Sequence, residues 1–256
     1  MMPALHPDFL RIPLAHRAFH DATAGRPENS IEAVRAALEE GYGIEMDIQP
    51  SADGVPMVFH DYDLERLTGM PGNITGLSAD ALGRLPLLGG REAVPTLARV
   101  LAEVAGRVPL LIEIKDQSGA SGPEVGALER AVADALRGYA GPVAVMSFNP
   151  HSVAAFHAAA PDVAVGLTTA AYLPEDYPEL LGAVCDHLRD IRDYERVGAS
   201  FISHEAADLA RPRVAELKAR GAAVLCWTIR SPEAEAAARK IAHNITFEGY
   251  AASRHA

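Results

Sequence analysis

Short apolar runs alternate with amphipathic segments along almost the whole chain. The apolar runs have the length and bounded character of buried strands, and the amphipathic segments have the spacing of surface helices. Strands are predicted at residues 12–16, 43–49, 110–115, 143–148, 163–168, 199–203, 223–229 and 244–248. Helices are predicted at residues 30–40, 96–106, 124–136, 152–159, 213–220 and 232–241. Eight strands, each separated from the next by helical material, favour a single (β/α)8 TIM barrel of the α/β class.

An open, doubly wound sheet is the alternative fold. That fold prefers a glycine-rich phosphate loop after its first strand, and none follows residues 12–16. We find no linker, repeat or low-complexity segment, so residues 1–256 are expected to form one domain. Residues 69–95 resemble an elaborated loop, with a short helix at 78–85.

One apolar run, residues 55–59, follows the second strand too closely for a parallel crossover. Asp53-Gly54 is a strong signal for a two-residue hairpin turn. With these two residues as the loop, Asp47 lies opposite His60. The pattern therefore predicts a β-hairpin after strand 2 that returns His60 to the rim of the barrel. The alternative is a surface hairpin with an incidental histidine.

The composition is that of a soluble globular protein with a substantial core, because 49% of the 256 residues are hydrophobic and 22% are charged. The net charge of −11 argues against a nucleic-acid partner and against attraction to anionic membranes. An anionic substrate must then meet locally placed cations or a metal. Neither a signal peptide nor a membrane-spanning run is found, which favours a cytoplasmic protein without stable membrane insertion. Cys185 and Cys226 are expected to be buried thiols.

Ionisable side chains gather near the ends of four apolar runs, although unpaired charge is costly in a buried strand. This placement suggests one shared polar site. The residues concerned are His16, Arg17, Glu45, Asp47, His60, Asp61, Glu113 and Lys115.

Glu45 and Asp47 are two residues apart, so on a strand they point to the same side. Together with Glu113 they would repel one another at the mouth of a barrel, and their pKa values would rise. A divalent cation resolves that repulsion, and an all-oxygen ligand set suits Mg²⁺ or Ca²⁺ better than zinc. The alternative is a structural network in which these acids pair with Arg17 and Lys115.

A metal with Arg17 and Lys115 beside it is suited to a phosphoryl group, because arginine binds phosphate in a bidentate manner and lysine acts as a point charge. His16 and His60 are then the natural acid and base, since imidazole titrates near neutrality. Either histidine alone would more simply be structural.

Several short motifs occur in a fixed order along most of the chain. They are His16-Arg17, Pro27-Glu28-Asn29-Ser30, Glu45-x-Asp47, Asp53-Gly54, Val58-Phe59-His60-Asp61, Leu64-Glu65-Arg66-Leu67-Thr68, Glu113-Ile114-Lys115, Ser147-Phe148 and Trp227-Thr228. In these motifs the chain resembles the glycerophosphodiester phosphodiesterase family, whose fold is a phospholipase C-like TIM barrel.

The resemblance implies metal-dependent hydrolysis of glycerophosphodiesters to glycerol 3-phosphate and an alcohol. By residue match, one Mg²⁺ or Ca²⁺ would be held by Glu45, Asp47 and Glu113. His16 and His60 would be the catalytic pair. Arg17 and Lys115 would bind the phosphate, and Trp227 would line the substrate pocket.

The chain departs from the family pattern at three places, one of which is the stretch 18–26, longer here than in compact members of the family. Ala18 stands where the family usually has glycine after His-Arg, and the last strand ends in Phe247-Glu248 instead of Thr-Asp. These changes leave every proposed chemical group in place, and they bear on substrate identity more than on reaction type.

Two other functions are compatible with the sequence. A lysophospholipase D-like enzyme would need an apolar groove, which the leucines of residues 69–95 could supply unless they pack onto the barrel. A non-catalytic binding protein could use the same barrel, because fold alone does not establish function. The oligomeric state stays open.

Overall fold

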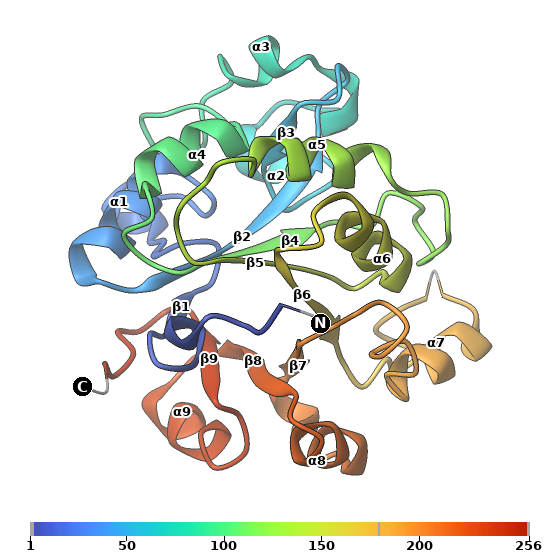
Figure 1. Ribbon diagram of the computed structural model, residues 1–256. Coiled ribbons are helices and arrows are strands. Elements are labelled where there is room, and N and C mark those ends of the chain that lie inside the picture. Colours follow the sequence, from blue (N-terminus) through green and yellow to red (C-terminus); the bar gives the residue numbers. More distant parts are fainter. Residues whose placement is uncertain (1–2, 179, 255–256) are drawn as a thin grey trace.

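Eight parallel strands close into a barrel in the computed structural model, which describes residues 3–178 and 180–254 (Figure 1). The barrel strands are β1 (Leu14–Ala15), β2 (Gly43–Pro50), β4 (Leu110–Ile114), β5 (Val143–Ser147), β6 (Ala164–Thr169), β7 (Phe201–Glu205), β8 (Ala223–Ile229) and β9 (Asn244–Phe247). Strand β1 pairs with both β2 and β9, and this pairing closes the sheet. The predicted TIM barrel is therefore confirmed, and the open sheet is excluded.

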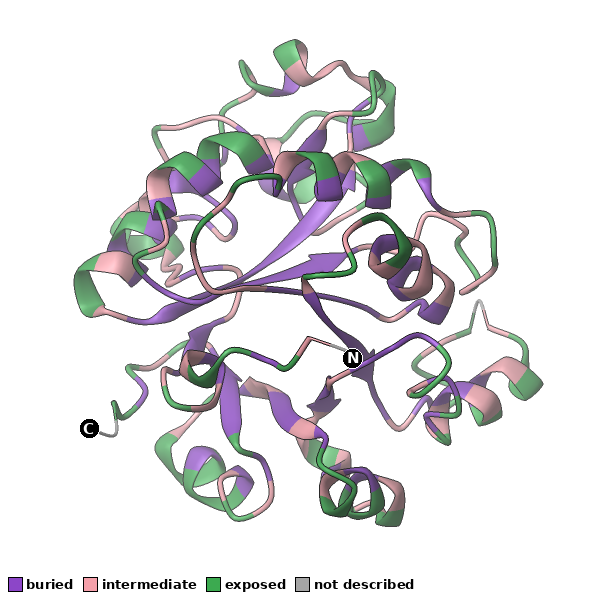
Figure 2. Cartoon of the chain, in the orientation of Figure 1, coloured by how far each residue is buried: buried purple, intermediate pink, exposed green. Residues whose placement is uncertain are grey.

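Helices surround the strands and turn their apolar faces inward (Figures 1 and 2). They are α1 (Ile31–Glu40), α4 (Leu97–Val104), α5 (Ala127–Ala135), α6 (Pro150–Ala159), α7 (Gly182–Arg189), α8 (Pro212–Ala219) and α9 (Pro232–Ala238). Ser30 caps α1 and Ser231 caps α9, each accepting a backbone N–H with its side chain, as their sequence positions predict. Cys185 and Cys226 are both buried free thiols. Among the described residues, no helix is long and apolar enough to cross a bilayer.

Short elements cover the hairpin side of the barrel and line its ends. They are η1 (Pro7–Leu10), η2 (Ala22–Ala24), α2 (Glu65–Thr68), η3 (Ile74–Gly76), α3 (Ala79–Leu82) and η4 (Ala206–Asp208). Leu82 and Leu87 are buried in a satellite core with Met57 and Phe59. Of the large apolar side chains in residues 69–95, only Met70 and Leu88 are exposed. This segment therefore packs onto the protein and does not form the apolar groove considered above.

The predicted hairpin exists, but its predicted register is wrong by one residue. Strand β3 (Pro56–Val58) pairs with β2 antiparallel, with Pro50 opposite Pro56. The Ser51 N–H donates to the carbonyl of Val55, so the loop has three residues and ends on Gly54 at φ 79°.

The register correction changes how His60 reaches the barrel. Phe59, not His60, lies opposite Asp47 and donates its N–H to the Asp47 carbonyl at 3.0 Å. Strand β3 ends at Val58, and the chain then bends so that His60 still arrives at the rim beside Asp47.

Apolar side chains fill the barrel interior at the amino-terminal end of the strands. The members of this cluster include Leu14, Leu111, Ala144, Met146, Phe201 and Leu225 from the strands, and Phe9 from η1. Asn244 holds the N-terminal segment in place by donating its amide to the carbonyls of Phe9 and Ile12. Gly166 leaves the space that the Phe201 ring occupies, because a Cβ there would lie 2.4 Å from the ring. The interior is thus filled at the amino-terminal end of the strands, and the polar site lies at their carboxyl-terminal end.

We expect Gly166→Ala to lower the free energy of unfolding by about 1–3 kcal/mol, because the added methyl overpacks the interior against Phe201. Adding Phe201→Leu to that variant should recover part of the loss, which urea unfolding can measure. A Gly166→Ala variant as stable as the wild type would contradict this packing.

Candidate active site

Three carboxylates converge at the carboxyl-terminal mouth of the barrel. Glu45 and Asp47 project from β2, and Glu113, which pairs with Asp47 in the sheet register, projects from β4. Their ligand oxygens lie within 4.8 Å of one another, and each residue is at most 5% exposed. The three predicted acids are therefore together, in an all-oxygen donor set that a hard divalent cation could occupy.

The charges within this cluster are unequal. Burial raises the pKa of Glu45, and the nearby carboxylates of Asp47 and Glu113 raise it further. Burial also opposes ionisation of Asp47, but the positive charges of Lys115, His60 and Arg17 outweigh it and lower the pKa of that carboxyl. The cluster therefore has an excess of negative charge that a proton or a cation must neutralise.

Two basic side chains lie against the carboxylates. Lys115 Nζ is 2.7 Å from Glu113 Oε1 and 3.4 Å from Asp47 Oδ1. Burial opposes the charge of Lys115, yet these two carboxylates raise the pKa of its ammonium group above the ordinary value. Arg17 donates its backbone N–H to Glu45 Oε2 at 2.9 Å, and its Nε is 3.6 Å from Asp47 Oδ2. The sequence offered two interpretations of the three acids, a metal site and an ion-pair network with Arg17 and Lys115. The structure contains the ion pairs, and they involve the same acids that could hold a metal.

The loop between β1 and α1 has a left-handed backbone at three residues other than glycine, and these lie against the cluster. Arg17, Ala18 and Asn29 have φ of 51°, 66° and 57°. The N–H of Ala18 donates to the carbonyl of Glu45, and Asn29 donates its side-chain amide to Asp47 Oδ2 at 3.0 Å. Ala18 thus adopts a conformation that favours glycine, with its small methyl group buried in the core.

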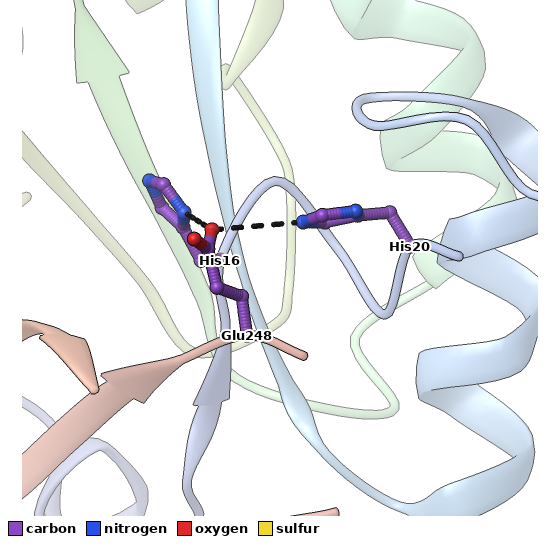
Figure 3. Close-up of side chains that lie close together, drawn as sticks. All are labelled: His16, His20 and Glu248. Atoms are coloured by element: carbon purple, nitrogen blue, oxygen red, sulfur yellow. Dashed lines mark hydrogen bonds and ion pairs between the residues drawn. The ribbon is translucent and has the colours of Figure 1, made fainter. Parts of the chain in front are cut away.

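His16 follows β1 and is oriented by a carboxylate from the end of β9. It donates Nδ1–H to Glu248, whose Oε1 also accepts from Arg230 Nε at 2.7 Å. His20 points at the same carboxylate from the other side, with Nε2 3.7 Å away (Figure 3). The hydrogen bond from His16, with the His20 imidazole close by, holds the pKa of Glu248 well below its usual range. An ionised carboxylate only accepts, so His16 carries hydrogen on Nδ1 and presents Nε2, 4.0 Å from Glu45, to the site.

His60 has a similar support on the opposite side of the mouth. Its Nδ1 donates to Asp61 at 2.7 Å, and Asp61 accepts from Arg66 Nε at 2.6 Å. Arg66 also donates to Glu28, which accepts in turn from Arg17. Burial lowers the pKa of the His60 imidazole, and the charges of Lys115 and Arg17 add to this effect against the opposing charge of Asp47.

All eight side chains selected from the sequence line one cavity of about 200 Å³. They are His16, Arg17, Glu45, Asp47, His60, Glu113, Lys115 and Trp227. Trp227 donates its indole N–H to the carbonyl of Ser203 at 3.0 Å and meets Phe148 edge to face. Its ring therefore both packs and lines the cavity. A larger cavity adjoins this one, and His60 lines both whereas His16 lines only the smaller.

Sequence reasoning assigned no role to five polar residues that hold these side chains in place. They are Glu28, Asn29, Asp61, Arg66 and Glu248. Most lie inside the short motifs noted above, and Glu248 directly follows β9 as His16 follows β1 and Lys115 follows β4. That common position at strand ends was the available signal for Glu248.

We expect Glu248→Gln to lower the free energy of unfolding by about 1–3 kcal/mol at pH 7, since it removes the charge from the hydrogen bonds to His16 and Arg230. The folded pKa of Glu248 lies below the unfolded value, so this stabilisation is present above pH 4.5 and is lost as the pH falls. Urea unfolding should therefore show the difference between the two proteins shrinking below about pH 4.5, so that it is smaller at about pH 3.5 than at pH 7. A difference of constant size over this pH range would contradict the assignment, and the exposed Glu39→Gln on α1 is the control.

The chain is similar in sequence to several known proteins. A model of the glycerophosphoryl diester phosphodiesterase family matches residues 16–246. Bovine glycerophosphodiester phosphodiesterase 1 is 35% identical over 100 residues, which is 35% of this chain and 29% of the bovine protein. A glycerophosphodiester phosphodiesterase of Caldanaerobacter subterraneus is 31% identical over 150 residues, covering 55% of this chain and 60% of that protein. The matched segments thus span less than two thirds of these relatives.

Solved structures share the fold over nearly the full length. A phosphodiesterase of Oleispira antarctica in complex with the product sn-glycerol-3-phosphate superposes with a TM-score of 0.77 at 23% identity, covering 94% of this chain and 93% of that one. A glycerophosphodiester phosphodiesterase of Parabacteroides distasonis gives a TM-score of 0.73, also at 23% identity, with 93% and 92% covered.

Proposed function

The chain belongs to the glycerophosphoryl diester phosphodiesterase family, and from that premise we propose that it hydrolyses glycerophosphodiesters to glycerol 3-phosphate and an alcohol. The single observation that carries the proposal is the cavity in which three buried carboxylates, two basic side chains and two supported histidines face one another. We propose that the whole chain, residues 1–256, acts as one domain with a small-molecule substrate.

The carboxylates of Glu45, Asp47 and Glu113 are proposed to hold one divalent cation, Mg²⁺ or Ca²⁺. Their fit rests on the convergence of their oxygens and on the pKa of Glu45, which burial raises and the neighbouring carboxylates of Asp47 and Glu113 raise further. When bound, the ion supplies Lewis-acid polarisation of the phosphoryl oxygens and neutralises developing charge.

The two histidines divide the proton transfers between them. His16, which presents a free Nε2 in the smaller cavity, takes the proton from the attacking hydroxyl, whether that belongs to water or to the substrate's own glycerol. His60 lies where the two cavities meet and gives its proton to the departing alcohol oxygen. The anionic phosphate of a bound diester favours the protonated form of His60, against the burial that lowers its pKa.

Arg17 and Lys115 are proposed to bind the non-bridging phosphate oxygens. Both line the cavity and both hold their positive charge despite burial, because carboxylates surround them. Trp227 is proposed to pack against the glycerol carbons, since its ring faces the cavity while its N–H is already satisfied by Ser203.

Removal of divalent ions with a chelator should abolish alcohol release from glycerophosphodiesters, and Mg²⁺ or Ca²⁺ should restore it. Glu113→Gln should raise the half-saturating ion concentration by at least about tenfold, because it removes one ligand charge. Coupled assay of glycerol 3-phosphate measures both effects, with Glu39→Gln as the matched control. Full activity in chelator would refute the metal proposal, and binding of diesters without any hydrolysis would favour a non-catalytic binding protein.

Alanine at His16 or at His60 should lower kcat for an alkyl diester by about 10²–10⁴-fold. A p-nitrophenyl leaving group needs little protonation, so it should rescue His60→Ala and leave His16→Ala impaired. Equal rescue of both variants, or of neither, would contradict the division of roles. His6→Ala, at the closed end of the barrel, is the control for loss of a histidine, and circular dichroism checks the fold.

A further inference from the structure

A cavity of about 590 Å³ adjoins the smaller cavity at the barrel mouth. The linings of the two cavities share His60, Glu113, Lys115 and Phe148, so the larger cavity begins beside the carboxylates. The smaller cavity, at about 200 Å³, has room for little beyond a phosphoryl group and its glycerol. The larger cavity therefore lies next to the reacting centre, on the side of His60.

Aromatic rings form a continuous row from the reacting centre across this cavity. Trp227 contacts Phe148 with ring centroids 5.5 Å apart, Phe148 contacts Tyr172 at 6.4 Å, and Tyr172 contacts Tyr177 at 4.8 Å. The last three rings line the larger cavity, and Leu180 continues the apolar wall.

Tyr172, Tyr177 and Leu180 lie in the connection between β6 and α7. This connection also has apolar side chains that are exposed to solvent. Leu173 is 43% exposed and Leu181 is 76% exposed, although large apolar residues are otherwise mostly buried in the described part of the chain. Tyr62 stands on another loop of the cavity wall and is 49% exposed. Apolar side chains thus occur both on the cavity wall and on the exposed part of the connection between β6 and α7.

Carboxylates also line the larger cavity, but protein donors already bind them. Asp61 accepts from His60 and Arg66. Asp116 accepts from Ser118 and from Asn149. Asp63 accepts from a backbone N–H of α2. Apart from Glu113 and Lys115 beside the reacting centre, the rings and Leu180 therefore supply the apolar surface that faces the cavity.

We propose that the larger cavity binds the alcohol portion of the substrate, and that this alcohol is an apolar alkyl or aryl group of several carbons rather than a small polar head group. The inference rests on the proposed phosphodiesterase activity. The bond that breaks joins phosphorus to the alcohol oxygen, the attacking hydroxyl oxygen replaces it on phosphorus, and the proton on His60 goes to the departing oxygen. The apolar alcohol thus leaves along the aromatic row.

A homologous series of n-alkyl esters of sn-glycerol 3-phosphate, from methyl to hexyl, tests this directly. The leaving alkanols have nearly the same acidity, so differences in kcat/KM report binding of the chain. We expect kcat/KM to rise about 2–4-fold per methylene until the chain spans the cavity. Hydrolysis of every member at the same kcat/KM would overturn the inference while leaving the phosphodiesterase proposal intact. Failure to hydrolyse any member would count against the phosphodiesterase proposal itself.

An isosteric pair of esters separates apolar from cationic recognition. The choline ester and its neutral 3,3-dimethylbutyl counterpart have the same shape, and aromatic rings can also attract a quaternary ammonium group. We expect the neutral ester to be the better substrate by kcat/KM. A preference of tenfold or more for the choline ester would overturn the apolar assignment.

Substitutions in the cavity wall should change how steeply kcat/KM rises with alkyl chain length. They should not change kcat/KM for the methyl ester. Leu180→Asn keeps the size of the side chain but makes it polar, and Tyr62→Ala removes a ring from a different loop. Each should flatten the increase per methylene while the methyl ester keeps its kcat/KM within about twofold. Leu88→Asn, exposed and outside the cavity, is the control. A wild-type slope in both wall variants would contradict the proposed subsite.

Discussion

The repulsion among three buried carboxylates at the barrel mouth is the constraint on which the rest of the site depends. Glu45, Asp47 and Glu113 lie side by side because adjacent parallel strands in register place them there. Burial makes such charges expensive unless they are compensated. Lys115 and Arg17 provide part of that compensation, while burial and the carboxylates of Asp47 and Glu113 still raise the pKa of Glu45. A divalent cation is the natural remainder.

Hydrogen bonds and ion pairs connect the carboxylate cluster to His60, and a separate carboxylate supports His16. Arg17 touches Glu45 and Asp47 on one side and Glu28 on the other. Through Glu28 and Arg66 the connection reaches Asp61 and so the His60 ring. Glu248 fixes His16 separately, with His20 and Arg230 around it. In each imidazole, Nδ1 is hydrogen-bonded to a carboxylate, and this bond fixes the orientation of the ring and so the direction of Nε2. The site is therefore preorganised before a substrate binds.

Much of this could be predicted from the sequence, because periodicity and strand-end chemistry are local properties. The barrel follows from the alternation of elements, and the same-face spacing of Glu45 and Asp47 follows from the pleat. The hairpin register could not be predicted so well. Asp53-Gly54 indicates a turn, but the hydrogen bonds of Ser51 decide whether the loop has two residues or three.

Other features depend on contacts between distant segments. Glu248 meets His16 across 232 residues, and only closure of the barrel brings them together. Ala18 at φ 66° is tolerated because its methyl is buried in a core that the local sequence does not reveal. Residues from four loops line the larger cavity beside the site. The leucines of residues 69–95, which suggested an apolar groove, mostly pack onto the protein instead.

The central claim is that the carboxylate cluster is a site for one divalent cation. Anomalous diffraction from crystals grown with Mn²⁺ tests it most directly, because the ion itself is located. We predict one strong peak with an oxygen of Glu45, Asp47 and Glu113 each within roughly 2.0–2.6 Å. A cluster without a peak, with Lys115 still bridging Glu113 and Asp47 at saturating Mn²⁺, would contradict it and leave a purely structural ion-pair network.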